Sequence, residues 1–138
     1  MSMPEAVFYQ PRSVPLLRRI VTYLVVAVAR LLAIQSPRRI RTALGWVRRG
    51  AKPATVEQAK AVRDDVVAVS LHCAAREGCV ARSLATVLLC RLRGWWPTWC
   101  VGARRVPPFA AHAWVEADGV MVGEDYPPDY FRTLFTVP

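Results

Sequence analysis

The chain has 138 residues, 54% of them hydrophobic, which is enough for one domain with a substantial core. Its formal net charge is +9, and this excess lies entirely in residues 1–52, where ten basic side chains accompany a single acidic one, Glu5. Residues 53–138 carry nine basic and nine acidic side chains and are neutral. This balance argues against a nucleic-acid-binding surface there, so an electrostatic partner is expected at the N-terminal third.

The four cysteines predict free thiols rather than a disulfide framework or a metal site. No secretory signal is recognisable, because the apolar stretch near the N-terminus is followed by Ser-Pro-Arg-Arg at 36–39 and not by a small-residue cleavage site. A cytoplasmic, reduced protein is therefore expected. No Cys-x-x-Cys pair occurs, and adjacent His72 and Cys73 do not have a common zinc-ligand spacing, so no metal or other cofactor is predicted.

The first predicted helix runs from about Val14 to Ile34. Its apolar part, from Ile20 onward, would be about 22 Å long, short of the ~30 Å needed to cross the hydrocarbon core of a membrane. Large apolar side chains recur at three- and four-residue steps on one stripe: Leu17, Ile20, Leu24, Val28 and Leu31. The stripe predicts packing on the domain or on a partner. Binding to a membrane surface, with arginines at the helix ends, is the alternative.

Capping residues mark two further helices. Ser-Pro at 36–37 suits the N-cap and first turn of a helix that continues to about Arg49. Thr55 and Gln58 have the spacing of a capping box for a third helix, which we expect to continue to about Arg76. Helical structure is thus predicted for most of the first half of the chain.

A fourth helix is predicted from Cys79, directly after Gly78, to about Arg93. Apolar residues surround it almost completely, which is typical of a central, buried helix, and its arginines at 82, 91 and 93 are expected to reach solvent. Strands are predicted over 95–102, 110–117 and 120–124, followed by an irregular tail from Tyr126 whose aromatic residues could cover the core. Helices followed by an antiparallel sheet predict an α+β domain that forms one compact unit.

Cys79 is a candidate nucleophile because of its position. At a helix N-terminus, unpaired backbone N–H groups and the helix dipole favour the thiolate, which is the reactive form of cysteine. Nearby Arg76 and Arg82 would act in the same direction. The other cysteines, Cys73, Cys90 and Cys100, are interpreted as small core residues.

His112 begins a predicted strand and is the candidate general base for Cys79. Either Glu124 or Asp125 could orient its imidazole, depending on the turn at Asp118-Gly119. A two-residue loop would place Asp125 opposite His112, whereas a three-residue loop with a bulge would place Glu124 there. The residues alone leave this choice open.

The segments GCVARSLATVLLCRLRG and PFAAHAWVEADG, with an acidic residue after the second, resemble the transglutaminase-like leader peptidases of lasso-peptide biosynthesis. The similarity is strongest over residues 78–124 and is greatest to the form in which the protease is a separate small protein. It implies a papain-like, transglutaminase-like fold, with Cys79 as nucleophile, His112 as base and Glu124, twelve residues later, as the third member. Glutamate stands here where aspartate is common, and Gly123 where asparagine often precedes the acid.

The resemblance also implies the reaction and the partners. The substrate would be a ribosomally made precursor peptide, cut between leader and core so that a separate lasso cyclase could use the new core amine. Residues 53–138 would form the catalytic core, and the basic helical segment 1–52 would offer a docking surface for a separate small leader-binding protein, the leader or a membrane. No nucleic acid is expected.

Two other functions use the same sequence features. A thioester intermediate can react with an amine instead of water, so transglutaminase-like amide exchange on a peptide is an alternative to hydrolysis. A non-catalytic basic binding module, with Cys79 and His112 in structural roles, is the alternative from a different class. It would show strongly salt-dependent binding to an anionic partner.

Overall fold

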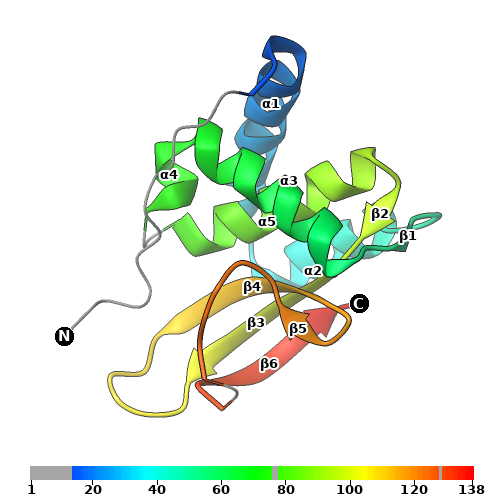
Figure 1. The fold of residues 1–138 in the computed structure, drawn as a ribbon. Helices are drawn as coiled ribbons and strands as arrows, with labels where there is room; N and C mark the ends of the chain where they lie inside the picture. Colours follow the sequence, from blue (N-terminus) through cyan, green and yellow to red (C-terminus); the bar gives the residue numbers. More distant parts are fainter. Residues whose placement is uncertain (1–13, 76–77, 128) are drawn as a thin grey trace.

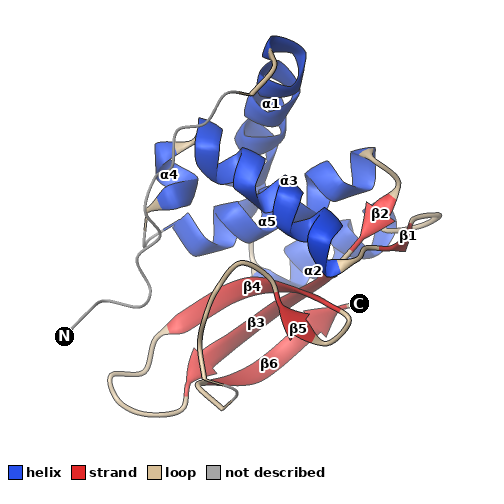
Figure 2. Ribbon diagram, viewed as in Figure 1, coloured by secondary structure: helices blue, strands red, loops and turns tan. Residues whose placement is uncertain are grey.

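The structure, a computed structural model, describes residues 14–75, 78–127 and 129–138. Helices form one layer and a four-stranded sheet forms the other (Figure 1, Figure 2). The helix and strand bounds are α1 Leu16–Ala33, α2 Pro37–Val47, β1 Lys52–Pro53, α3 Val56–Val69, α4 Leu71–Ala74, α5 Cys79–Leu92, β2 Trp95–Trp96, β3 Thr98–Arg104, β4 Ala111–Ala117, β5 Val120–Met121 and β6 Phe131–Val137.

The helix α5 lies at the centre of the molecule, as its nearly continuous apolar surface predicts. It packs against α1 and α3 on one side and against β4 on the other. Leu84, Val87 and Leu89 of α5 are fully buried in a core that also takes Val25 and Ala29 from α1 and residues from the sheet. The core therefore extends across both layers. It also includes residues from both the basic helical segment 1–52 and the expected catalytic core 53–138.

The predicted apolar stripe of α1 is the face that the domain leaves exposed, and α1 instead buries Thr22, Val25, Val26 and Ala29. Of the two expected alternatives, packing of the stripe on the domain is therefore excluded, and packing on a partner stays a prediction. The smaller side chains of α1 face α5 instead. The exposed fractions of the stripe lie between 48% and 75%: Leu17, Ile20, Leu24, Val28 and Leu31. No helix in the described part of the chain is long and apolar enough to span a membrane.

The predicted third helix is interrupted at Ser70. This residue has an extended backbone (φ −130°, ψ 113°), and its side chain accepts a hydrogen bond from the N–H of Cys73, so it both ends α3 and caps α4. The sequence signal for α3 itself was sufficient, since Thr55 and Gln58 form the predicted capping box. The break separates the short α4 from α3, and α4 ends five residues before α5 begins.

The main sheet has the strand order β5-β4-β3-β6, with every neighbouring pair antiparallel. Its last strand, β6, lies in the tail that the sequence predicts to be irregular. That expectation is wrong, because long-range pairing with β3 stabilises β6 as a strand. The strand could not be recognised from its own residues because it has no regular alternation of buried and exposed positions. The predicted strand from Trp95 is divided at Pro97, and its first part, β2, pairs with β1 in a separate two-stranded sheet.

Candidate active site

Cys79 is the first residue of α5, as predicted, and its side chain is partly exposed. Gly78 precedes it as the N-cap, and a Cβ on Gly78 would collide with the carbonyl oxygen of His72. Only glycine allows this close approach of the two backbones. The turn before α5 thereby presents the thiol at a helix end, where the unpaired N–H groups favour a negative charge.

His112 is the second residue of β4 and is 6% exposed. Its ring stacks on Phe131 of β6, with ring centroids 4.7 Å apart, and on Trp114, with centroids 5.9 Å apart. Tyr126 contacts it edge-on at 5.6 Å. The imidazole is thus held by aromatic rings from its own strand, from β6 and from the segment before β6, which fixes its orientation and limits its access to water.

Glu124, and not Asp125, contacts His112. The distance between His112 Nε2 and Glu124 Oε1 is 2.7 Å, and both side chains are 6% exposed, whereas Asp125 points into solvent. The ring nitrogen that remains for Cys79 is therefore Nδ1. A carboxylate on Nε2 sets the imidazole tautomer and stabilises the imidazolium form.

The hairpin has one of the two predicted registers, but His112 does not contact the acid that this register would place opposite it. The turn has a two-residue loop, with positive φ at Asp118 and Gly119, and it pairs Glu116 with Met121. If the strand pairing continued in this register as far as His112, Asp125 would lie opposite it. The ladder ends before that point, because Gly123 has a φ of +74° and turns the chain so that Glu124 reaches the imidazole.

The protonation states of Cys79 and His112 are coupled. Burial by itself lowers the pKa of His112, but hydrogen bonds to Cys79 and Glu124, together with their negative charges, outweigh it and raise this pKa to about 9. Burial by itself raises the pKa of Cys79, but hydrogen bonds from His112 and from the Ala113 N–H, with the charges of His112 and Arg82, lower it below its ordinary value. Both shifts favour the thiolate–imidazolium pair over the neutral thiol and imidazole.

Arg82 is buried within the site, which corrects the expectation that it reaches solvent. It is 1% exposed, and its Nη1 donates hydrogen bonds to the carbonyl oxygens of Cys73 (2.9 Å) and Ala75 (3.3 Å). Its Nη2 lies 3.7 Å from Glu124 Oε1. The available sequence signal was the position of Arg82 three residues after Cys79, since residues at this spacing share a helix face.

A second buried arginine, Arg63 of α3, was not predicted as part of the site. It is 7% exposed, and it occupies the space that a Cβ on Gly123 would need. Burial and the charge of Arg82 lower its pKa, although Glu124 acts in the opposite direction. Two buried guanidinium groups, those of Arg63 and Arg82, therefore act on Glu124.

The side chains of the remaining sequence candidates take no part in the contacts between Cys79, His112 and Glu124. His72 is exposed on α4, whereas Cys73, Cys90 and Cys100 are buried, and burial raises the pKa of each of the three thiols. The four cysteines are free. Arg76, expected to stabilise the thiolate, lies outside the described residues, and within those residues no cluster of ligands suits a metal ion.

A cysteine at a helix N-terminus, a histidine on an adjacent strand and a carboxylate on that histidine can perform acyl transfer through a covalent thioester. Comparison with protein families agrees with this geometry, because the model of the transglutaminase-like superfamily matches residues 22–136. The chain belongs to the transglutaminase-like superfamily. Its α+β structure agrees with that membership, and the matched region includes Cys79, His112 and Glu124. No curated protein and no solved structure matches the chain.

Proposed function

We propose that this protein is a cysteine peptidase that removes the leader from a ribosomally made lasso precursor peptide. The observation that carries the catalytic part is the Cys79–His112–Glu124 cluster, in which hydrogen bonding and charge favour a thiolate paired with an imidazolium. Membership of the transglutaminase-like superfamily supports a cysteine-based enzyme. The assignment to lasso precursors rests on the similarity of the segments around Cys79 and His112 to the leader peptidases.

In the proposed reaction, the Cys79 thiolate attacks the carbonyl carbon of the last leader residue. The resulting oxyanion is stabilised by the backbone N–H of Cys79, one of the N–H groups that a helix leaves without an intrahelical partner. The imidazolium of His112 donates a proton to the departing core amine as the C–N bond breaks. The leader is then held on Cys79 as a thioester, and the core peptide leaves with a free α-amine.

The second half of the reaction regenerates the enzyme. Neutral His112 takes a proton from a water molecule as that water attacks the thioester, and the Cys79 thiolate leaves as the C–S bond breaks. Glu124 keeps the imidazole oriented in both steps and stabilises its positive charge. The proposed products are a leader with a new carboxylate and a core peptide that a cyclase could join to one of its own acidic side chains.

The proposal includes a separate leader-binding protein, and we assign its docking to the exposed stripe of α1. Five large apolar side chains are exposed there on the most basic third of the chain. Deleting residues 1–52 would not test this assignment, because Val25, Val26, Ile40 and Leu44 belong to the core. Substituting Leu24 and Leu31 with serine keeps that core and should weaken partner binding. Unchanged partner affinity in the folded double variant would contradict the assignment.

Cleavage of the precursor encoded beside this protein tests the function directly. The protein is incubated with the precursor and the small leader-binding neighbour, and the products of the parent, Cys79→Ala and His112→Ala are compared by mass spectrometry. Cys90→Ala is the matched control, because this cysteine is buried away from the cluster. We expect cleavage to be lost in Cys79→Ala and His112→Ala and to be retained in Cys90→Ala. Cleavage that persists in Cys79→Ala would contradict the mechanism.

The same experiment separates hydrolysis from amide exchange. Hydrolysis gives a leader that ends in a carboxylate, and the masses of leader and core together exceed that of the precursor by one water molecule. Amide exchange with an added amine gives a leader carrying that amine instead. A basic binding module without catalytic function would give neither product, and its affinity for partners would be the same in Cys79→Ala.

A further inference from the structure

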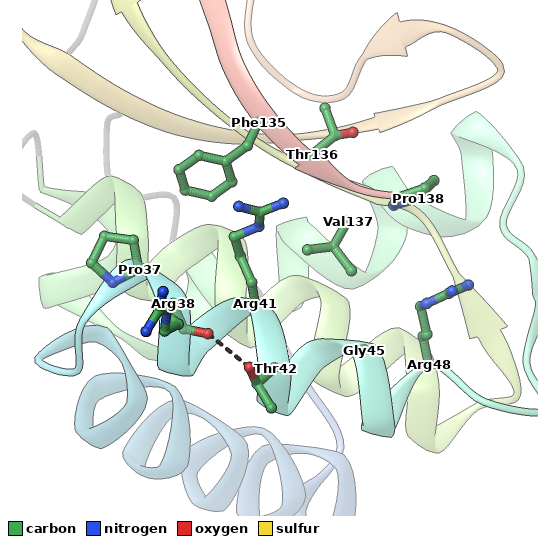
Figure 3. A pocket seen from close by; sticks show the side chains of 10 residues that line it. All are labelled: Pro37, Arg38, Arg41, Thr42, Gly45, Arg48, Phe135, Thr136, Val137 and Pro138. Carbon is green, nitrogen blue, oxygen red and sulfur yellow. Dashed lines mark hydrogen bonds between the residues drawn. The ribbon is translucent and has the colours of Figure 1, made fainter.

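A groove with a volume of about 480 Å³ lies between α2 and the end of β6 (Figure 3), and Cys79 is not among the residues that line it. Helix α2 forms one wall and four consecutive residues at the end of the chain form the other. This volume is within the range of ~300–1,000 Å³ that is usual for ligand sites. The lining residues that carry the argument are Arg38, Arg41 and Arg48 of α2 and Phe135, Thr136 and Val137 of β6.

The groove is strongly basic. Its three arginines are exposed, and among the described residues no aspartate or glutamate lines the groove or pairs with them. Arg41 points from α2 toward β6, and its guanidinium lies 4.9 Å from the ring centroid of Phe135 (Figure 3). Arg48 lies near Pro138 at the other end of the groove (Figure 3). Three unpaired guanidinium groups along one groove are complementary to a ligand with several carboxylates.

The second wall is the free edge of a sheet. β6 pairs with β3 on one side, and no other strand of the described chain pairs with it on the other. Successive side chains of a strand point to opposite faces, so a groove that four consecutive residues line is not confined to one face of the sheet. Such an edge carries unpaired backbone groups that an extended peptide can bind by adding itself as a further strand.

We propose that this groove binds an acidic stretch of the peptide substrate, which adds to the free edge of β6 in an extended conformation. Backbone hydrogen bonds to β6 would hold the stretch, and its carboxylates would contact the three arginines of α2. The inference rests on the proposed function, because it assigns a binding site to the same substrate. It places substrate recognition on the opposite end of β6 from the reaction.

The position of β6 relates the groove to the cysteine and histidine. Phe131 at the start of β6 stacks on His112, whereas the groove begins at Phe135. At about 3.3 Å per residue, four residues of strand separate these points by roughly 13 Å, and Val137 lies roughly 20 Å from Phe131. A peptide that follows β6 would therefore carry its acidic residues about four to six positions from the bond that is cut.

Binding is tested with the full chain carrying Cys79→Ala, so that no peptide is cleaved. The probe is a fluorescein-labelled peptide of twelve alternating threonine and glutamate residues, and its affinity is measured by fluorescence anisotropy at low salt. We expect the double substitution Arg41→Gln and Arg48→Gln to weaken binding at least tenfold. Arg39→Gln is the matched control, because Arg39 is exposed on the same helix but does not line the groove, and a change of less than twofold is expected.

Three further probes separate the possible results. A peptide with lysine in place of glutamate should not bind measurably, and N-methylation of alternate backbone nitrogens should weaken binding of the glutamate peptide because it removes strand hydrogen bonds. A single-stranded oligonucleotide of equal charge should bind more weakly than the glutamate peptide. The inference is overturned if the glutamate peptide does not bind, if the double variant binds it like the parent, if N-methylation has no effect, or if the oligonucleotide binds more tightly.

Failure of this inference is distinguishable from failure of the proposed function. Binding that depends on Arg41 and Arg48, without cleavage of any precursor by the parent protein, would contradict the peptidase assignment and leave the groove in place. If the double substitution does not affect cleavage and the glutamate peptide does not bind, the proposed peptide-binding role of the groove is wrong and the peptidase assignment stands.

Discussion

Arg82 connects Glu124 to the segment that precedes the nucleophile. Its Nη2 lies 3.7 Å from Glu124 Oε1, and its Nη1 donates hydrogen bonds to the carbonyl oxygens of Cys73 and Ala75. Because Arg82 itself belongs to α5, one buried side chain joins the helix that carries Cys79, the loop before it and the acid that orients His112. The relative positions of the three proposed catalytic residues depend on this contact.

Replacing Arg82 should therefore affect both stability and catalysis. Arg82→Gln removes one of the buried charges beside Glu124, which keeps its contact with His112, and we expect the free energy of unfolding to fall by about 3–5 kcal/mol, as for other buried pairs that lose one partner. Denaturant titration measures this loss. Arg82→Lys keeps the charge and should recover part of the stability and more of the activity. If Arg82→Gln is as stable and as active as the parent, the proposed positioning role is wrong.

The pH dependence of cleavage should be bell-shaped. Activity should rise as the Cys79 thiolate forms, at a pH below the ordinary pKa of a thiol, because hydrogen bonds and nearby positive charges lower the pKa of Cys79. It should fall near pH 9, where the imidazolium of His112 loses the proton that the leaving amine needs. The two limbs report apparent pKa values of the coupled pair formed by Cys79 and His112, and not of either residue alone. A single limb near the pKa of a free thiol would contradict the ion pair.

Substitutions of the neighbouring acids Glu124 and Asp125 should have very different effects on kcat/KM. Glu124→Gln removes the charge that raises the pKa of His112, so kcat/KM should fall about 10²-fold or more and the upper limb should move to lower pH. Asp125→Asn should change kcat/KM by less than about threefold, because its side chain is exposed. Measuring both variants across pH checks the assignment, and a larger loss in Asp125→Asn would reverse it.

Two glycines should respond to alanine with opposite signs. Gly78→Ala would force a Cβ into the carbonyl of His72 and displace the start of α5, so both stability and cleavage should fall. Gly45→Ala places a Cβ in open space within α2 and should stabilise the protein by about 1 kcal/mol, since alanine favours helix over glycine. Thermal unfolding of both variants tests this. Equal stability in the parent and Gly78→Ala would show that the close approach is not required.

The local parts of the fold were predictable because short-range interactions determine them. Ser36 and the capping box at Thr55 begin α2 and α3 where the sequence predicts, and Gly78 separates α5 from the segment before it. The N-terminal position of Cys79 follows from the same signals. The strand β6 was not predictable, because its stability comes from pairing with β3 across about thirty residues of chain and not from its own pattern.

The orienting acid shows where local reasoning ends. The two-residue turn at Asp118-Gly119 agrees with one of the two predicted registers, yet the strand pairing ends before it can decide between Glu124 and Asp125. Arg63 packs against Gly123 at this point, so a residue sixty positions earlier shapes the turn that aims Glu124. A register argument within the hairpin could not include that contact.

The sequence by itself determined the helices, the α+β class, the charge asymmetry and the placement of Cys79 and His112 at the starts of their elements, since capping, glycine breaks and hydrophobic pattern act over a few residues. Tertiary structure alone decided three things: which acid contacts His112, that Arg82 is buried among them, and which face of α1 remains exposed. Each depends on contacts between distant segments, where burial and charge outweigh local preference.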